Sequence, residues 1–203
     1  MSIDVLFPSY LYRSQFANPR KFNRELAREI AALRDMDDYG RQWSETHYVG
    51  GYSSYSSMCN LHQTSPNFAE LEERLAPHVQ RFIKKLNWNL MGRRVQMTTC
   101  WVNLMAQGTY HTLHVHPSSV LSGVYYVDVP KGSSPLKIED PRMSQLMAAP
   151  PRKRTAPANQ QNYLLIDAKP GQFLLFESWM RHEVPPHRAK QPRLSVSFNY
   201  EWL

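Results

Sequence analysis

The second half of the chain is a succession of short strand-like segments, and this pattern constrains the fold more than any other feature. Beyond residue 94, β-branched and aromatic residues dominate, and Pro, Gly, Ser and Asn recur between the segments. The segments are Val95–Met105, Thr112–Val115, Val120–Val129, Leu136–Ile138, Tyr163–Ile166, Gln172–Phe176 and Leu194–Trp202. Six or more short strands of this kind predict a β-sandwich or barrel.

Two helical patterns precede the strands. Apolar residues repeat at helical spacing from Asn18 to about Arg34 and again from Ser65 to about Leu86. Ser65 is the expected N-cap of the second helix, and Pro66 occupies its first position. Pro77 lies inside this pattern and predicts a kink or a break. We therefore expect a mainly β (α+β) fold with N-terminal helices packed on one outer face of the barrel.

The length of 203 residues fits one domain, with a helical part at about 1–93 and a barrel core at about 94–203. A hydrophobic content of 42% is enough for one sizeable core and excludes overall disorder. No apolar run approaches the roughly 18 residues of a membrane span, and the N-terminus lacks a signal peptide's basic region. Two cysteines, Cys59 and Cys100, predict reduced thiols in a cytoplasmic protein. The aperiodic stretch 141–162 predicts a functional loop, such as a lid.

The charge balance favours an anionic partner. Lys and Arg number 24 against 17 Asp and Glu, which gives a net charge of +7. The basic residues are spread along the chain, so nucleic acid is the less favoured partner, although still open. A membrane is not an expected partner, and a homodimer is compatible with the sequence.

Three of the eight histidines lie in one strand-like segment. Because side chains alternate along a strand, His114 and His116 are expected on one face and His111 on the other. Two positions place their Cα atoms roughly 6.5–7 Å apart, close enough for both imidazoles to reach one metal ion. The alternative is a pair of surface histidines at a strand end.

A second candidate group lies near the C-terminus. His182 follows one strand, and Arg193 opens the last strand eleven positions later. On this last strand one face is polar and carries Arg193, Ser195, Ser197 and Asn199. That face points either to solvent or into the barrel, where a buried Arg would require an anion.

These motifs together resemble a known family. The matching segments, in order, are His-x-His-Pro at 114–117, Leu-Ser-Gly-Val-Tyr-Tyr-Val at 121–127, Asp-Pro-Arg at 140–142, Pro-Gly-x-x-x-x-Phe at 170–176, His182, and Arg-x-Ser-x-Ser-Phe-Asn at 193–199. They resemble a bacterial and phage group of iron(II)/2-oxoglutarate-dependent oxygenases over roughly half of the chain. The fold of that family is a double-stranded β-helix, a cupin-like jelly-roll barrel, which agrees with the strand pattern.

The resemblance implies a role for each motif. His114 and His182 match iron ligands, and His116 stands where the wider superfamily has Asp or Glu. Fe(II), 2-oxoglutarate and dioxygen are the implied cofactors. Arg193 matches the residue that holds the distal carboxylate of 2-oxoglutarate through a bidentate pair. Further cosubstrate contacts are implied for Tyr126, Asn103 and Ser195.

The histidine at position 116 leaves alternatives open. Three neutral imidazoles leave Fe(II) at +2, which favours a dianionic cosubstrate but also admits zinc, nickel or copper. We expect a hydroxylase-type 2-oxoglutarate dioxygenase acting on an unidentified substrate. The rivals are a 2-oxoglutarate-independent three-histidine dioxygenase, a metal-binding relic, and a non-catalytic cupin-like module that binds an anion or nucleic acid. Arg193 argues against a dioxygenase that ignores 2-oxoglutarate, because such an enzyme has no distal carboxylate to hold.

Overall fold

The computed structural model describes residues 1–203, apart from the side chains of Gln145 and Leu146. Its strands are β1 Leu11–Gln15, β2 Tyr52–Ser53, β3 Val95–Met105, β4 His111–His114, β5 Leu121–Asp128, β6 Leu136–Glu139, β7 Tyr163–Ile166, β8 Gln172–Glu177, β9 His182–Val184 and β10 Arg193–Trp202. Its α-helices are α1 Arg20–Met36, α2 Asp38–His47, α3 Leu61–Thr64 and α4 Pro66–Leu86. Two short 3-10 helices span Met143–Met147 and Ala158–Gln160.

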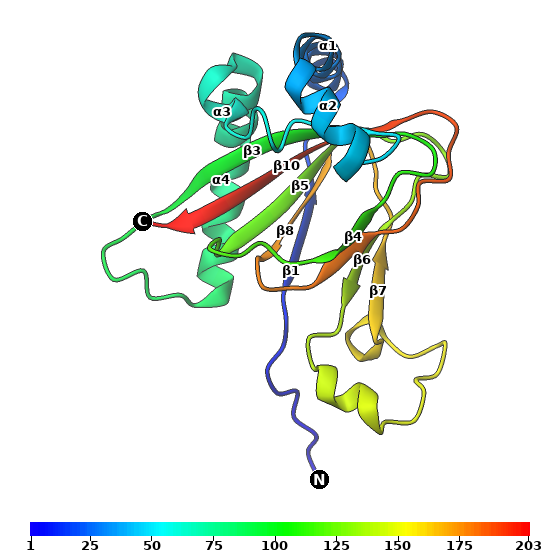
Figure 1. The fold of residues 1–203 in the computed structure, drawn as a ribbon. Coiled ribbons are helices and arrows are strands. Elements are labelled where there is room, and N and C mark those ends of the chain that lie inside the picture. The colour runs from blue at the N-terminus through cyan, green and yellow to red at the C-terminus, as the bar shows by residue number, and fades with distance from the viewer.

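The strands form two sheets. The larger sheet has six strands in the order β1-β8-β5-β10-β3-β2, and the smaller has four in the order β4-β9-β6-β7. Neighbouring strands in both sheets are antiparallel. Figure 1 shows the smaller sheet at the lower right of the larger one, with α1, α2 and α3 above the sheets. The mainly β architecture agrees with the sequence prediction.

The helices cover one face of the larger sheet. Apolar side chains of α1 and α4 are buried against strands β3, β5, β8 and β10, and this helix–sheet layer forms the larger part of the core. The layer includes Leu26, Ile30, Phe68, Leu71, Leu75, Val102, Phe173, Val196 and Phe198. A second apolar cluster lies between the two sheets and includes Met105, Tyr126, Leu136 and Phe176. Helices α1 and α4 thus leave the opposite face of the larger sheet free to line a cavity.

The second long helix corrects two details of the sequence prediction. Ser65 does occupy the N-cap position of α4, but its side chain makes no capping hydrogen bond. Pro77 lies inside α4, which continues to Leu86, so the predicted break is wrong. Val79, Phe82 and Ile83 follow Pro77 and are buried in the core. Their burial outweighs the loss of one backbone hydrogen bond at Pro77.

Several short elements had no sequence signal. Helix α2 starts directly after α1, where Asp37 caps it by accepting a hydrogen bond from the backbone N–H of Gly40 at 2.9 Å. Strands β2 and β9 have only two and three residues, too few for a periodic pattern. None of the described helices combines the length and apolar character that a membrane span needs.

Candidate metal centre

A cavity of about 280 Å³ lies between the two sheets. Its wall on the larger sheet comes from β2, β3, β5, β8 and β10, and its wall on the smaller sheet from β4, β6 and β9. The polar face of β10 lines it, with Arg193, Ser195, Ser197 and Asn199 all contributing. Of the two orientations that the sequence left open for this face, the one that points into the barrel is correct.

Three histidines meet in this cavity. His114 ends β4, His182 begins β9, and the two are paired across the strands. His116 follows β4, and its Nε2 lies 3.3 Å from Nε2 of His182. One nitrogen from each of the three rings lies within 4.8 Å of the others, an arrangement that suits a single metal ion.

Backbone carbonyls orient two of these rings. Nδ1 of His114 lies 2.6 Å from the carbonyl oxygen of Thr112, and Nδ1 of His182 lies 2.9 Å from that of Met180. A carbonyl oxygen can only accept, so each Nδ1 must carry the proton and donate it. The Nε2 atom of each ring is then left unprotonated and free to coordinate a metal.

The environment keeps the imidazoles of His116 and His182 neutral. Burial lowers the pKa of His116 to about 3, with smaller contributions from His182 and His114. Burial also lowers the pKa of His182 to about 4, and His114 adds to the effect. A neutral imidazole is the form that binds metal, so the cluster is prepared for a cation at neutral pH.

The structure contradicts the expected orientation of His111. The pairing of His111 with Val184 and of His114 with His182 leaves two residues of β4 opposite one residue of β9, which is a β-bulge. The extra residue returns His111 to the cavity face, where its ring centre lies 6.3 Å from that of His114. Burial, followed by the charge of Arg193, lowers the pKa of His111 to about 3. His111 therefore also lines the cavity, outside the close group of three.

Arg193 is buried in the same cavity with an incomplete set of partners. Its side chain is 2% exposed, and Nη1 donates a hydrogen bond of 2.9 Å to the carbonyl of Ser134. Its Nε is buried and has no hydrogen-bond partner. Among the side chains that the structure describes, no carboxylate forms an ion pair with it. Such a guanidinium is prepared for an anionic ligand.

The remaining predicted residues line the same cavity. Tyr126 is buried, and the guanidinium carbon of Arg193 lies 5.6 Å from the centre of its ring. The Asn103 amide accepts a hydrogen bond from Ser53 at 2.9 Å and donates one to Ser197 at 3.0 Å. Ser195 faces Asn103 across the strand pair. The structure thus brings the seven predicted site residues to one cavity.

Sequence reasoning missed Tyr48, which follows α2. Its side chain is 3% exposed, and its hydroxyl is buried without a hydrogen-bond partner. Its ring stacks on His111 with 4.5 Å between the centres. Burial raises the pKa of Tyr48, while the positive charge of Arg193 acts in the opposite direction. A single tyrosine at the end of an unpredicted helix gives no sequence signal that could have identified it.

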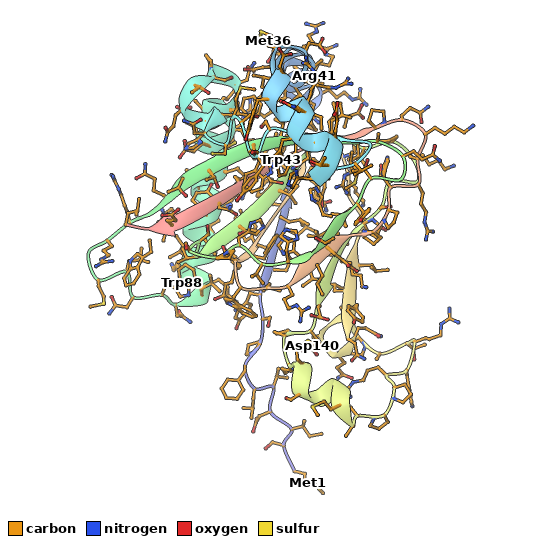
Figure 2. The ribbon with its side chains drawn as sticks, in the orientation of Figure 1. Met1, Met36, Arg41, Trp43, Trp88 and Asp140 are labelled. Atoms are coloured by element: carbon orange, nitrogen blue, oxygen red, sulfur yellow. The ribbon has the colours of Figure 1, made fainter. Side chains whose placement is uncertain are left out.

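The loop 141–162 lies elsewhere. In Figure 1 it extends beyond the ends of β6 and β7, at the opposite end of the molecule from α2. Figure 2 shows the same separation between Asp140, at the start of the loop, and Trp43 on α2. None of its described side chains lines the cavity, so the expected lid does not cover the histidines in this structure. Asp140 accepts a hydrogen bond of 3.0 Å from the backbone N–H of Arg142, which makes Asp-Pro-Arg a turn.

The chain is similar to known oxygenases in sequence profile and in fold. The profile of a family described as "Putative 2OG-Fe(II) oxygenase" matches residues 99–199, about half of the chain. No functionally curated protein is similar in sequence at a significant level.

Solved structures share the fold at low identity. A Pseudomonas putida prolyl-4-hydroxylase is 15% identical with a TM-score of 0.62, covering 95% of this chain and 92% of its own. The epimerase SnoN from nogalamycin biosynthesis is 13% identical with a TM-score of 0.65, covering 95% and 78%. HygX from Streptomyces hygroscopicus, with nickel and 2-oxoglutarate bound, is 13% identical with a TM-score of 0.64, covering 95% and 83%.

The similarities confirm the predicted double-stranded β-helix. They also confirm the expected cofactors, because enzymes of this family use Fe(II), 2-oxoglutarate and dioxygen. The three-histidine cluster and the buried guanidinium lie within the stretch that the profile matches. This chain therefore belongs to the 2OG-Fe(II) oxygenase family.

Proposed function

We propose that the protein is a dioxygenase that hydroxylates its substrate, with His114, His116 and His182 as the ligands of Fe(II). Such a reaction converts 2-oxoglutarate and dioxygen to succinate and carbon dioxide and leaves one oxygen atom on the substrate. Bound iron would supply the redox chemistry that activates dioxygen. The protein's own part is to hold the reactants in place and to exclude water.

The observation that carries this proposal is the unpartnered Nε of Arg193 in the same cavity as the three histidines. Burying a guanidinium without a matching anion is costly. The distal carboxylate of 2-oxoglutarate would complete its hydrogen bonds through a bidentate pair. A three-histidine dioxygenase that does not use 2-oxoglutarate would leave the cost uncompensated.

Other groups support the same carboxylate site. The buried hydroxyl of Tyr48 lacks a partner and is close enough to Arg193 for its pKa to respond to that charge. It can donate a second hydrogen bond to the carboxylate. We assign Tyr126 and Ser195 to the same end of the cosubstrate because both line the cavity beside Arg193. Asn103, held by Ser53 and Ser197, would present a fixed amide to it.

The neutral ligand set fits a dianionic cosubstrate. Three imidazoles leave a divalent ion with its full charge, whereas a carboxylate ligand would halve the net charge of the site. The extra positive charge, together with Arg193, strengthens the attraction for both carboxylates of 2-oxoglutarate. The same ligand set also suits nickel, copper and zinc, so metal identity has to be measured on the isolated protein.

Anaerobic absorbance spectroscopy tests the proposal directly. Adding 2-oxoglutarate to the Fe(II) protein should produce a new metal-to-ligand charge-transfer band, because the cosubstrate chelates the metal. Arg193→Ala should retain the metal and lose the band at the same 2-oxoglutarate concentration. Tight metal binding with no band at any concentration would instead favour the three-histidine dioxygenase. Failure to bind any divalent metal would favour the non-catalytic module.

A further inference from the structure

Four rings line the cavity together, and we call them the aromatic wall: Trp43, His47, Tyr55 and Trp101. Trp43 and His47 lie one turn apart on α2 and stack with 4.5 Å between ring centres and an interplanar angle of 3°. Tyr55 meets Trp101 edge to face at 5.0 Å. Three of the four precede residue 99, where the family profile begins, so they lie outside the segment that the profile matches.

The aromatic wall runs from solvent to the metal centre. Tyr55 is 50% exposed, His47 is exposed and Trp43 is half-buried, whereas Trp101 is 6% exposed. The Trp101 ring centre lies 6.0 Å from that of His116. A molecule that entered the cavity would pass the exposed rings first and reach the metal beside Trp101.

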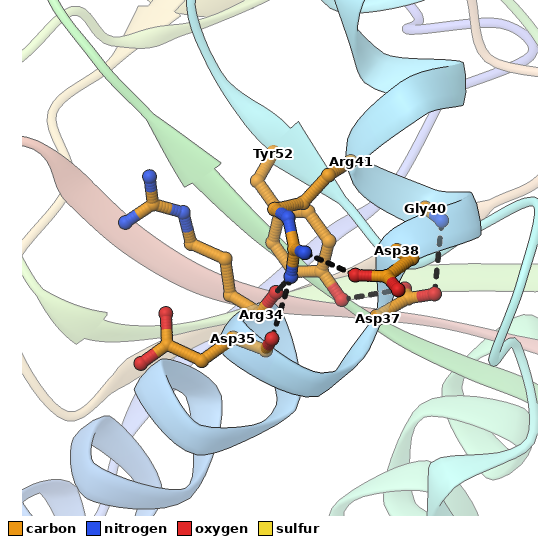
Figure 3. A network of polar contacts seen from close by, with 7 residues as sticks. All are labelled: Arg34, Asp35, Asp37, Asp38, Gly40, Arg41 and Tyr52. Carbon is orange, nitrogen blue, oxygen red and sulfur yellow. Dashed lines mark hydrogen bonds and ion pairs between the residues drawn. The ribbon is translucent and has the colours of Figure 1, made fainter.

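A buried carboxylate holds most of this wall in place. Asp37 accepts hydrogen bonds from the backbone N–H of Gly40 at 2.9 Å, from the hydroxyl of Tyr52 at 2.8 Å and from that of Ser57. Figure 3 shows the first two of these contacts, beside Arg41, which bonds the carbonyls at the end of α1. Asp37 therefore ties α2 to the segment on both sides of Tyr55. Rings fixed before a ligand arrives cost little entropy on binding.

The charge around the cavity limits what can bind. Among the described side chains that line it, none is Asp or Glu, and Arg193 is the permanent cation. A divalent metal would add further positive charge. A cationic ligand would be repelled, although aromatic rings by themselves attract cations.

We infer that the substrate presents a planar aromatic ring with a neutral or anionic substituent, and that the ring stacks on the aromatic wall. This inference rests on the proposed function for its reaction, but ring binding can be measured separately. Aromatic pairs contribute about 0.5–1.5 kcal/mol beyond simple burial, which corresponds to a 2- to 12-fold change in affinity for each ring removed.

Two matched pairs of probes test charge and planarity. Indole-3-acetate and tryptamine share a ring and differ in charge, while phenylacetate and cyclohexylacetate share a charge and differ in planarity. Calorimetry on the anaerobic Fe(II)–2-oxoglutarate protein should show binding of indole-3-acetate and phenylacetate, with tryptamine and cyclohexylacetate at least about tenfold weaker. Tyr55→Ala should lower the affinity for indole-3-acetate about 2- to 12-fold and leave the affinity for 2-oxoglutarate unchanged.

Tyr39→Ala is the matched control, because Tyr39 is an exposed tyrosine on α2 that does not line the cavity. It should leave probe affinity unchanged. Equal binding of tryptamine, or of cyclohexylacetate, would overturn the inference, as would an equal effect of the two tyrosine variants. If the charge-transfer band never forms, the proposed function fails. The same calorimetric comparison on the metal-loaded protein then still decides whether the wall binds rings.

Discussion

Two buried charges, one in the helical part and one in the barrel, are satisfied to different degrees. Asp37 receives three hydrogen bonds, from Gly40, Tyr52 and Ser57. Arg193 has one carbonyl partner, and its Nε has none. Buried polar groups in native proteins are nearly always hydrogen-bonded. The complete set around Asp37 therefore identifies a structural anchor, whereas the incomplete set around Arg193 identifies a place for a ligand.

The largest expected effect concerns the histidines beside Arg193. His182→Ala should abolish metal binding at stoichiometric concentration, because it removes one of three ligands from the cluster. His114→Ala and His116→Ala should do the same. His111→Ala should keep most of the metal, since His111 lies outside the close group. Metal quantification after dialysis measures this, and equal loss in the His111 and His116 variants would refute the assignment.

Removing the Arg193 guanidinium, whose hydrogen bonds are incomplete, should weaken the binding of 2-oxoglutarate and leave the metal in place. Arg193→Ala should cost roughly 2–5 kcal/mol of 2-oxoglutarate binding, about one and a half to nearly four decades of affinity. Arg193→Lys should recover only part of this, because an ammonium cannot present two parallel donors. Titration calorimetry on the anaerobic Fe(II) protein gives the affinity. Unchanged affinity in Arg193→Ala would remove the main support for a 2-oxoglutarate enzyme.

Removing the Asp37 carboxylate, whose hydrogen bonds are complete, should instead lower the stability of the fold. Asp37→Ala leaves three donors without an acceptor and should lower the free energy of unfolding by about 2–3 kcal/mol. Asp38→Ala is the control, because its exposed carboxylate pairs with Arg41 at the surface and should contribute under about 1 kcal/mol. Urea denaturation measures both. A loss of 2-oxoglutarate affinity in Asp37→Ala at unchanged stability would contradict the comparison.

Two buried tyrosines sharpen the comparison further. The hydroxyls of Tyr48 and Tyr200 are both buried without a partner, but only Tyr48 lines the cavity. Tyr48→Phe should lower the affinity for 2-oxoglutarate about 2- to 12-fold, which corresponds to the loss of one ordinary hydrogen bond. Tyr200→Phe should leave that affinity unchanged, and neither variant should lose stability. Equal effects on affinity would mean that the Tyr48 hydroxyl does not contact the ligand.

The smallest expected effect is a pH dependence in the helical part. His62 is buried in α3, and burial lowers its pKa below 6.5, with the backbone of Met97 opposing the shift. The unfolded chain then binds more protons than the folded one below about pH 6.5, so stability falls as the pH drops through that range. His62→Leu should reduce this fall. Urea denaturation at pH 7.5 and 5.5 measures it, and an unchanged slope would assign the acid sensitivity to other groups.

Long elements could be predicted from the sequence, and short ones could not. Strands β3 and β10 have eleven and ten residues rich in β-branched and aromatic side chains, so their positions followed from the sequence, as did the polar face of β10, but the direction of that face did not. Strand β9 has three residues and follows a turn, so only the family resemblance identified His182. Helix α2 and Tyr48 take their positions from the Asp37 contacts, which join residues up to 20 positions apart. No local window contains that information.

The bulge in β4 also determines how this strand would respond to a change in length. In a regular strand, a deletion of one residue moves the following side chains to the opposite face. Here β4 carries one residue more than β9 between their paired positions, so a deletion of Thr112 would remove the excess and restore a regular ladder. The segment would then read His-Leu-His-Val-His, with all three imidazoles on the cavity face. A relative one residue shorter at this point would therefore be expected to keep His111, His114 and His116 on the cavity face.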